Sequence, residues 1–452
     1  MTKQAGVGDR GHGLGVTVGD YDNDGAPDLY INNFGPNVFY RNNGDGTFSE
    51  VASQAGVIRG DKFGAGVCFL DIEGDGDLDL YVANYVAFSY ERHAVLRVTA
   101  DPYPPGPQDF PPVPDMLFRN KGDGTFTDIS GPSGIGAVAG PSMGVVCLDY
   151  DDDGDTDIFV CNDAAPNFLF RNDGHGRFQE VAVSAGVAYD LHGNANGHMG
   201  ADCGDYDGDG RLDLFVTDYT RQRPILFRNV GQGLFEDASS ISGVATAAYQ
   251  HTKWGTGLVD FDNDGRRDLF IACGHFLENI HDIDNGTAYR VRNVLLWNQG
   301  RRFIDVSAHC GDGLAVVASG RGAAFDDLDN DGAIDVVVLN SNARPTILRN
   351  VSATNQHWLQ VLVHGVQTNR DGVGARVRVV AGDLAQVAEV HSGRAYQGHS
   401  GTRLHFGLGS RDRVDRIEVR WIGGGVETFP GCAADRLAVL TEGTGSRVAQ
   451  KQ

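Results

Sequence analysis

The sequence predicts an all-β fold, namely a β-propeller followed by a smaller antiparallel β domain. Three observations predict it. A nine-residue aspartate pattern recurs six times along the chain, each copy lies between short apolar segments, and the repeats lack the 3.6-residue periodicity of helices. Glycine supplies 63 of the 452 residues. That is about twice its average share, which indicates many tight turns.

The repeats predict the blades of the propeller. The first copy is "DYDNDGAPD", and the six copies begin at Asp20, Asp71, Asp149, Asp205, Asp260 and Asp327. A small-residue strand precedes each copy, and an apolar strand follows it. Four copies continue into "YRNNGDGTF", "FRNKGDGTF", "FRNDGHGRF" and "FRNVGQGLF", which predict strand, glycine turn and strand, and "WNQGRRF" is a degenerate fifth. Four short strands per repeat are typical of a propeller blade. Six blades carry the motif, and a seventh is left open.

The aspartates of each copy indicate a hard cation. Alternate residues of a tight loop can surround one cation with oxygen, which suits Ca²⁺, whereas unpaired carboxylates at this density would repel one another. We therefore expect about six structural Ca²⁺ ions. The candidate ligands occupy the first, third, fifth and ninth positions of each copy. They are Asp20, Asp22, Asp24 and Asp28; Asp71, Glu73, Asp75 and Asp79; Asp149, Asp151, Asp153 and Asp157; Asp205, Asp207, Asp209 and Asp213; Asp260, Asp262, Asp264 and Asp268; and Asp327, Asp329, Asp331 and Asp335. Glu73 replaces an aspartate, so calcium binding by the second loop is left open.

Charge and cysteine content exclude several functions. The formal net charge is −23, and the candidate ligands account for nearly all of it. The remainder is close to neutral, so we expect no nucleic-acid or membrane partner. Most of the seven cysteines lie in apolar runs and are expected to be reduced and buried. The first residues contain no apolar leader segment, so the chain is expected to be cytoplasmic.

These motifs resemble known families. DxDxDGxxD between strands resembles the FG-GAP/VCBS calcium-binding repeat of integrin-type propellers, and "RNxGDGTF" is shared by its bacterial members. Farther along, "NRDGVGARVRVV", "HSGRAYQGHS", "LHFGLG" and "VDRIEVRW" resemble the ASPIC/UnbV domain. The whole chain is thus similar to the cartilage-acidic-protein-like, UnbV-type family. The resemblance implies a propeller over residues 1–353, an ASPIC/UnbV-like β domain over 354–443 and a tail over 444–452. Some members resembling this chain occur in biosynthetic gene neighbourhoods, and secreted animal relatives act extracellularly.

The C-terminal domain has its own pattern. "WLQVLV", "ARVRVV" and "RIEVRW" alternate apolar and polar residues, which predicts antiparallel strands. We expect this domain to pack against the propeller and close it. Alternatively, a cleft between the two domains contributes to the functional site.

The candidate site lies on the face opposite the aspartate loops, here called the entry face, because the loops of a blade alternate between the two faces. Long loops on a rigid scaffold often carry function. The candidate catalytic residues are His12, His192, His198, His251, Lys253 and Arg321. The candidate substrate-binding residues are Lys62, Tyr103, Ser142, Asn194, Asn196, Trp254 and His275. His198 and Lys253 are expected in loops outside the blade cores.

Three hypotheses about function follow, because no known catalytic motif is present. The first, which we favour, is a cyclase- or isomerase-like enzyme of bacterial specialised metabolism that rearranges a small organic substrate by acid/base chemistry. The second is a non-catalytic propeller that binds glycans or a protein partner. The third places a transition metal among His12, His192, His198 and His251.

Overall fold

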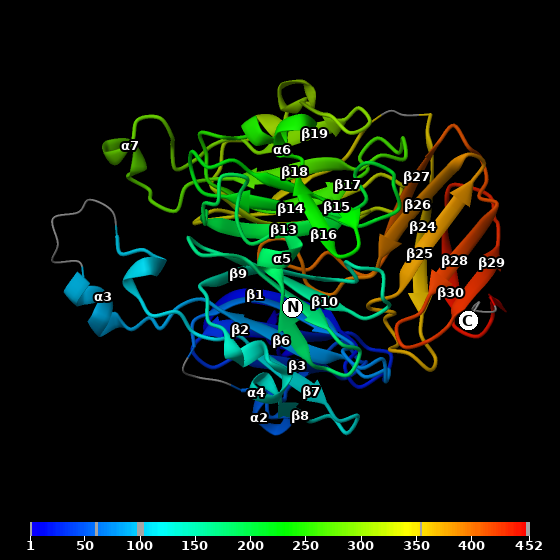
Figure 1. Ribbon diagram of the computed structural model, residues 1–452, viewed down its shortest axis with the longest axis horizontal. Helices are drawn as coiled ribbons and strands as arrows, with labels where there is room; N and C mark the ends of the chain where they lie inside the picture. The colour runs from blue at the N-terminus through cyan, green and yellow to red at the C-terminus, as the bar shows by residue number, and fades with distance from the viewer. Residues whose placement is uncertain (1, 59–61, 97–103, 353–354, 449–452) are drawn as a thin grey trace.

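The computed structural model describes residues 2–58, 62–96, 104–352 and 355–448. It confirms the all-β class: a ring of antiparallel sheets with a separate β domain against one of its faces (Figure 1). No helix in these ranges is long and apolar enough to cross a membrane.

Five blades contain four antiparallel strands, paired in chain order. Blade 1 is β1 (His12–Gly19), β2 (Asp28–Phe34), β3 (Val38–Asn42) and β4 (Phe48–Glu50). Blade 2 is β5 (Gly64–Leu70), β6 (Asp79–Asn84), β7 (Met116–Asn120) and β8 (Phe126–Asp128). Blade 3 is β9 (Ser142–Leu148), β10 (Asp157–Asn162), β11 (Phe168–Asn172) and β12 (Phe178–Glu180). Blade 4 is β13 (His198–Gly204), β14 (Asp213–Asp218), β15 (Ile225–Gly231) and β16 (Leu234–Asp237). Blade 5 is β17 (Lys253–Val259), β18 (Asp268–Cys273), β19 (Val294–Asn298) and β20 (Phe303–Asp305).

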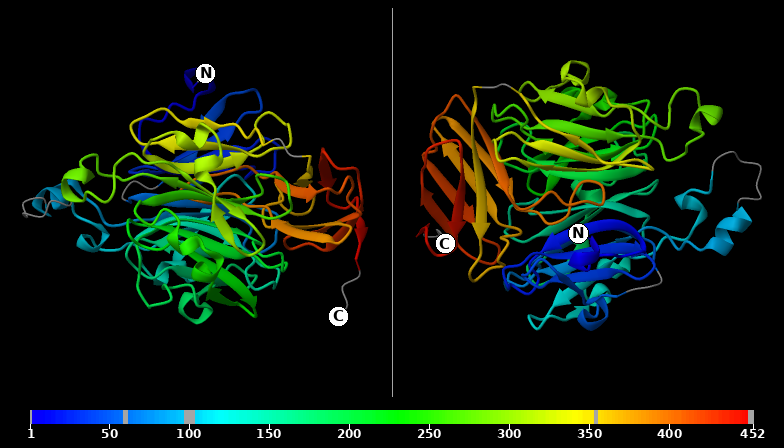
Figure 2. Two further views of the ribbon diagram at one scale, coloured as in Figure 1. Left: turned by 90° about the horizontal axis from the view of Figure 1, so that it is seen from above. Right: turned by 180° about the vertical axis from the view of Figure 1, so that it is seen from behind.

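Blade 6 has three strands, β21 (Gly320–Asp326), β22 (Asp335–Asn340) and β23 (Thr346–Leu348). The helices of the structure are short. They are α1 (Thr2–Ala5), α2 (Ala52–Ala55), α3 (Tyr90–Leu96), α4 (Ser130–Ser133), α5 (Ala182–Ala185), α6 (Ser239–Ser242) and α7 (Ile280–Ile283), with 3-10 turns η1 (Pro107–Asp109), η2 (Ile135–Ala137), η3 (Val244–Thr246), η4 (Ser307–His309) and η5 (Gly313–Ala315). Helices α3 and α7 extend from the side of the propeller opposite the C-terminal domain (Figures 1 and 2).

Neighbouring blades are joined by a recurring hydrogen bond. In blades 2 to 6, the asparagine of the "RN" pair, or of "WN" in blade 5, donates from Nδ2 to a backbone carbonyl in the aspartate loop of the preceding blade. The pairs are Asn120 to Tyr21, Asn172 to Ile72, Asn229 to Tyr150, Asn298 to Tyr206 and Asn350 to Phe261, at 2.8 to 2.9 Å. In blade 1 the equivalent Asn42 donates to Pro27 of its own blade, at 3.1 Å. This hydrogen bond between neighbouring blades is therefore not repeated between blade 6 and blade 1.

The ring has an open seam at that point. The innermost strands pack successively from β1 to β21, but within the described ranges no comparable packing joins β21 to β1. Leu328, which follows the first aspartate of the sixth loop, is 51% exposed, whereas the equivalent residues of the other five loops are at most 9% exposed. Blade 6 thus presents a blade-type face that no following blade covers.

The C-terminal domain consists of two sheets. One contains β24 (His357–His364), β27 (Leu404–Gly409) and β30 (Arg436–Thr441). The other contains β25 (Arg376–Ala381), β26 (Leu384–Glu389), β28 (Arg416–Arg420), β29 (Val426–Pro430) and β31 (Ser446–Arg447). Strand β31 lies within residues 444–452, which the sequence analysis expects to be a tail. Its backbone pairs with β29, so these two residues belong to the sheet.

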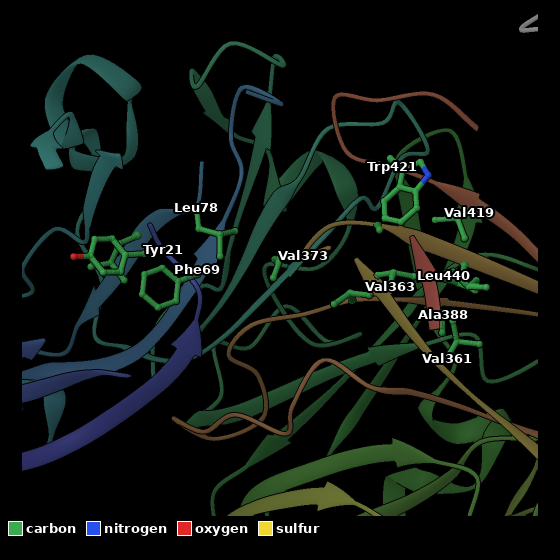
Figure 3. Packing of buried hydrophobic residues seen from close by; sticks show 14 of the residues in the cluster. Tyr21, Phe69, Leu78, Val361, Val363, Val373, Ala388, Val419, Trp421 and Leu440 are labelled. Carbon is green, nitrogen blue, oxygen red and sulfur yellow. The ribbon is translucent and has the colours of Figure 1, made fainter. Parts of the chain in front are cut away.

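One apolar cluster connects the domain to the propeller. It runs from Tyr21 and Phe69 in blades 1 and 2 through Val373 to Val363 and Trp421 in the C-terminal domain (Figure 3). The structure thus has the domain packed against the propeller, as the sequence predicts. Burial of this shared apolar surface stabilises the docked arrangement.

Candidate functional site

The aspartate loops bring carboxylates together in five of the six copies. In each group one oxygen from each of three residues lies within 4.8 Å of the others. The groups are Asp20, Asp22 and Asp28; Asp149, Asp151 and Asp157; Asp205, Asp207 and Asp213; Asp260, Asp262 and Asp268; and Asp327, Asp329 and Asp335. These residues hold the first, third and ninth positions of the pattern.

The fourth loop shows how the backbone positions these groups. The ninth-position Asp213 accepts hydrogen bonds from the Asn229 N–H, at 2.8 Å, and the Tyr206 N–H, at 3.0 Å. Asp205 accepts the N–H groups of the turn, including that of Gly210 at 2.9 Å. Burial raises the pKa of Asp213 to about 8. Taking this carboxylate out of water is therefore costly unless a cation offsets it.

Several buried oxygens in these loops lack a hydrogen-bond donor. The Asp207 side chain has no exposed surface, and its Oδ1 accepts no hydrogen bond from any described residue. One buried oxygen each of Asp22, Asp149 and Asp151 likewise has no hydrogen-bond partner among the described residues. Buried carboxylate oxygens without donors form the ligand set that a hard cation such as Ca²⁺ prefers.

The fifth-position aspartates, which the sequence analysis expects to be ligands, lie outside the close carboxylate groups. Asp209 accepts the Arg211 N–H at 3.1 Å and forms ion pairs with the Arg211 and Arg228 side chains. Asp24 likewise accepts the Ala26 N–H, at 2.9 Å. The turn directs these carboxylates to its own backbone, so three rather than four carboxylates converge in each group.

The second loop is not among the five groups. Glu73 is paired through Oε1 with Arg119 Nε at 2.8 Å, and its buried Oε2 lacks a hydrogen-bond partner in the described chain. With Glu73 paired to Arg119, the first, third and ninth positions of this loop, Asp71, Glu73 and Asp79, are not among the close groups found in the described residues.

The C-terminal domain rests on the aspartate-loop face. The Asp20 N–H donates to Asp371 at 2.7 Å, and Gln360 Nε2 donates to Asp327 Oδ2 at 2.8 Å. Arg420 forms an ion pair with Asp149. Three first-position aspartates thus contact the domain directly.

Residues 391–401 of this domain, here called the plug, enter the centre of the propeller, where Figure 2 shows them in orange between the blades. The plug touches all six blades. The contacts are Val16 N to Gln397 O, the Phe69–Ser392 bridge, His391 Nδ1 to Cys147 O, the Ala201–Ala395 backbone pair, the Trp254–Tyr396 ring contact and Phe325 N to Ser400 Oγ. Gly393 has a φ of +92°, and a Cβ there would lie 2.2 Å from Val67 O, so the path requires glycine.

The plug ends in an aromatic stack near the entry face. Tyr396 meets Trp254 at 4.9 Å between ring centroids, and Arg321 lies over the Trp254 ring at 4.5 Å. Trp254 Nε1 donates to Gly274 O at 2.6 Å and is 5% exposed. Met143 and Met199 pack in the same cluster. The sequence-predicted Trp254 and Arg321 are therefore together, and Tyr396 joins them from the other domain.

A pocket of about 430 Å³ opens beside this stack, in the seam between blades 6 and 1. Its walls include Leu14 and Val16 of blade 1 and Val337 and Leu339 of blade 6. Arg321 and the plug residues 396–399 complete the lining. The pocket size is within the range of small-molecule sites.

His198 and Lys253 are not loop residues, as the sequence analysis expected, but the first residues of β13 and β17. Both are fully buried. Lys253 Nζ pairs with Asp218 at 2.8 Å and donates to backbone carbonyls, including His251 O at 2.9 Å. His198 Nδ1 is 2.7 Å from Asn167 Oδ1, and burial lowers its pKa to about 4. These contacts join neighbouring blades, because Asn167 belongs to blade 3 and Asp218 to blade 4, and neither side chain reaches solvent.

Two of the predicted binding residues, Ser142 and His275, are also buried. Ser142 Oγ donates to Asp115 Oδ2 at 2.8 Å. His275 Nε2 is 2.8 Å from the Tyr219 hydroxyl, and its Nδ1 accepts the Leu277 N–H at 3.0 Å. Their polar atoms are engaged inside the protein.

The remaining candidates are spread over the entry face. His12 is exposed beside Phe34, His192 and Asn194 are exposed around Asp190, and Lys62, Asn196 and His251 are half-buried. Tyr103 lies outside the described residues. Where the structure is described, the close groups of three or more ligand residues consist of aspartates, so it does not bring His12, His192, His198 and His251 together.

Sequence reasoning missed a pair in the entry-face half of the channel. The Tyr85 hydroxyl donates to Asp163 Oδ2 at 2.6 Å, and burial raises the pKa of Asp163 to about 6. Both residues directly follow second strands, at "ANY" and "CND". This shared position after the second strand is the sequence signal that could have identified the pair.

Comparison with known proteins agrees with this architecture. The FG-GAP-like repeat model matches residues 20–82, 149–216, 205–271 and 260–338, and the ASPIC and UnbV model matches residues 365–447. Cartilage acidic protein 1 of Homo sapiens is 27% identical over 442 residues, which are 91% of this chain and 60% of the human protein. The Mus musculus protein is 27% identical over 445 residues, which are 91% of this chain and 62% of the mouse protein. The chain therefore spans about three fifths of the length of these relatives.

Solved structures show weaker likeness. A lectin of Agrocybe aegerita that recognises non-reducing terminal N-acetylglucosamine is 17% identical with a TM-score of 0.42, covering 76% of this chain and 81% of the lectin. The Dos1 propeller is 9% identical with a TM-score of 0.34, and the match covers 94% of this chain and 85% of the Dos1 chain. The family assignment instead follows from the repeat and domain models: the chain belongs to the FG-GAP-repeat proteins that carry a C-terminal ASPIC and UnbV domain.

Proposed function

We propose that this protein is a calcium-stabilised binding protein that holds a small organic ligand on the entry face. The observation that carries the proposal is the apolar pocket in the seam, next to the stack of Arg321, Trp254 and Tyr396. A concave apolar pocket with a few polar groups is the usual form of a ligand site.

The calcium part of the proposal is supported by the donor set. The five groups offer only carboxylate oxygens, and buried oxygens of Asp22, Asp149, Asp151 and Asp207 lack donors within the described structure. When bound, Ca²⁺ would supply charge neutralisation rather than chemistry. The aspartates would hold it in place, and the C-terminal domain that covers them would limit access of substrate.

Binding is favoured over the enzyme hypothesis because two of its central residues are unavailable. Lys253 is paired with Asp218, and His198 is hydrogen-bonded to Asn167, both without exposed surface. A general acid or base must reach the proton that it transfers.

An acid/base enzyme acting on a small organic substrate is the second candidate, favoured by the Tyr85–Asp163 pair. A carboxyl with a pKa near 6 changes protonation close to neutral pH, and its hydroxyl partner offers a proton path. In this case Asp163→Asn would abolish turnover while leaving ligand binding in place.

Two measurements test the proposal. Metal analysis of the purified full chain should find calcium, and a strong chelator should lower its melting temperature. The calcium-loaded protein is then screened by melting temperature against small organic acids, alcohols, amines and saccharides. We expect a saturable rise with at least one class, abolished by Leu14→Gln in the pocket wall. Indifference to chelator with no metal found would overturn the calcium part, and the absence of any saturable ligand would overturn the binding function.

A further inference from the structure

The seam pocket has apolar walls because the blade interface stops there. In blade 6, Val336 and Val338 are buried, whereas Val337 and Leu339 alternate with them and face the seam. Leu339 is 56% exposed. Leu14 and Val16 of β1 supply the opposite wall. Two apolar surfaces face each other across a space that no described side chain fills.

Arg321 brings an uncompensated charge to this pocket. Its guanidinium donates to neutral oxygens: Gly320 O at 2.8 Å, Ser319 Oγ at 3.0 Å and His275 O at 3.0 Å. Among the described residues no carboxylate forms an ion pair with it, although the guanidinium is partly withdrawn from water. Lys253, a fully buried cation in the neighbouring blade 5, has Asp218 as its partner. A half-buried cation without an anion is costly, and an anionic ligand would offset that cost.

His399 adds a second polar group without a partner. It lines the same pocket, and its Nδ1 is buried with no hydrogen-bond partner in the part of the chain that the structure describes. Burial lowers its pKa to about 4, so the ring is neutral at physiological pH. A neutral imidazole can donate one hydrogen bond and accept another.

We infer that the seam pocket binds a small amphipathic carboxylate, with its apolar chain between Leu14 and Leu339 and its carboxylate at Arg321. This inference rests on the proposed binding function and names the ligand class. A volume of about 430 Å³ accommodates an apolar chain of medium length. The carboxylate supplies the negative charge that Arg321 lacks, and His399 offers a further hydrogen bond.

The test is calorimetric titration of the calcium-loaded full chain with decanoate, decan-1-ol and acetate. We expect one site for decanoate, roughly tenfold or more weaker binding of decan-1-ol, which lacks the charge, and no measurable binding of acetate, which lacks the chain. Leu339→Gln should weaken decanoate binding about tenfold or more, because it places an amide in the apolar wall. Arg321→Gln should reduce the affinity for decanoate to that for decan-1-ol.

Leu328→Gln is the matched control, since Leu328 is an exposed leucine of the same blade that does not line the pocket. It should bind decanoate as the unmodified chain does. Equal affinities for decanoate and decan-1-ol would overturn the ligand class while leaving the binding function in place. Decanoate binding that is unchanged in both Leu339→Gln and Arg321→Gln would overturn the pocket assignment. Failure of every class in the melting-temperature screen would instead overturn the proposed function itself.

Discussion

Tyr396 of the C-terminal domain meets Trp254 of blade 5 with ring centroids 4.9 Å apart and ring planes at 64°. The two residues come from opposite faces of the propeller, because the domain rests on the aspartate loops while Trp254 lies at the entry-face end of β17. The plug, which carries Tyr396, contacts every blade. The ASPIC/UnbV domain is therefore part of the propeller core as well as a cover for one face.

Removing the Tyr396 ring should destabilise the folded chain. Tyr396→Ala leaves a void against Trp254, and loss of a half-buried aromatic contact costs about 2 kcal/mol or more. Tyr396→Phe keeps the ring and should cost much less. Denaturant unfolding of the calcium-loaded protein measures both, and equal stabilities of the Ala and Phe variants would contradict this role for the ring.

Lys253 should prove structural. Lys253→Met leaves Asp218 buried and unpaired, and breaking a buried ion pair costs about 3 to 5 kcal/mol. Adding Asp218→Asn removes the remaining charge and should restore part of the lost stability. The measurement is again denaturant unfolding. A Lys253→Met variant that keeps its stability but loses ligand binding would return Lys253 to the functional site.

The third and fifth positions of an aspartate loop should differ in their effect on calcium content. Asp207 belongs to a converging group although its Oδ2 pairs with Arg228, whereas Asp209 accepts its own turn's N–H and lies outside that group. Asp207→Ala should lose about one equivalent of calcium, and Asp209→Ala should lose less at saturating calcium. Metal analysis after equilibrium dialysis compares this matched pair. Equal losses would show that the fifth carboxylate coordinates the cation as the sequence pattern suggests.

The blades could be predicted from the sequence because their signals are local. The aspartate loop, the glycine turn and the "RN" pair lie within one repeat, so six copies define the strands around them. The three-carboxylate grouping was not predictable, because the pattern of alternate aspartates does not reveal that Asp209 accepts its own turn's N–H.

The plug and the buried Lys253–Asp218 ion pair depend on contacts between segments that are distant in the sequence. Ala201 and Ala395 exchange backbone hydrogen bonds across 194 residues of sequence, and nothing near either residue indicates the other. In the same way, "HTKWG" looks like a polar loop. Lys253 is instead buried because Asp218 at the end of β14, the Gln222 carbonyl and the His251 carbonyl satisfy its ammonium group.

Asp163 should make stability depend on pH. Burial raises its folded pKa to about 6 from 3.8, so the folded state binds this proton more tightly than the unfolded state. Its contribution is present below the unfolded pKa and is lost as pH rises through about 6. Asp163→Asn removes this loss, since the amide oxygen still accepts the Tyr85 hydrogen bond. The difference in unfolding free energy between variant and unmodified protein should therefore grow from pH 5 to pH 7.5, and parallel pH profiles would contradict it.

Calcium removal should loosen the plug. The C-terminal domain is held through residues of the aspartate loops, including Asp20 and Asp327, and without calcium their carboxylates repel one another. Hydrogen exchange of the Ala395 N–H, which donates to Ala201 O at 2.8 Å, should become faster in chelator. Exchange of the Val379 N–H in the middle of β25 is the internal control, because that strand is paired on both sides within the domain's own sheet.

Gly393→Ala should accelerate exchange at Ala395 even with calcium, since the added Cβ meets Val67 O. Unchanged protection of Ala395 in chelator, with calcium loss verified, would show that the plug is held independently of the metal.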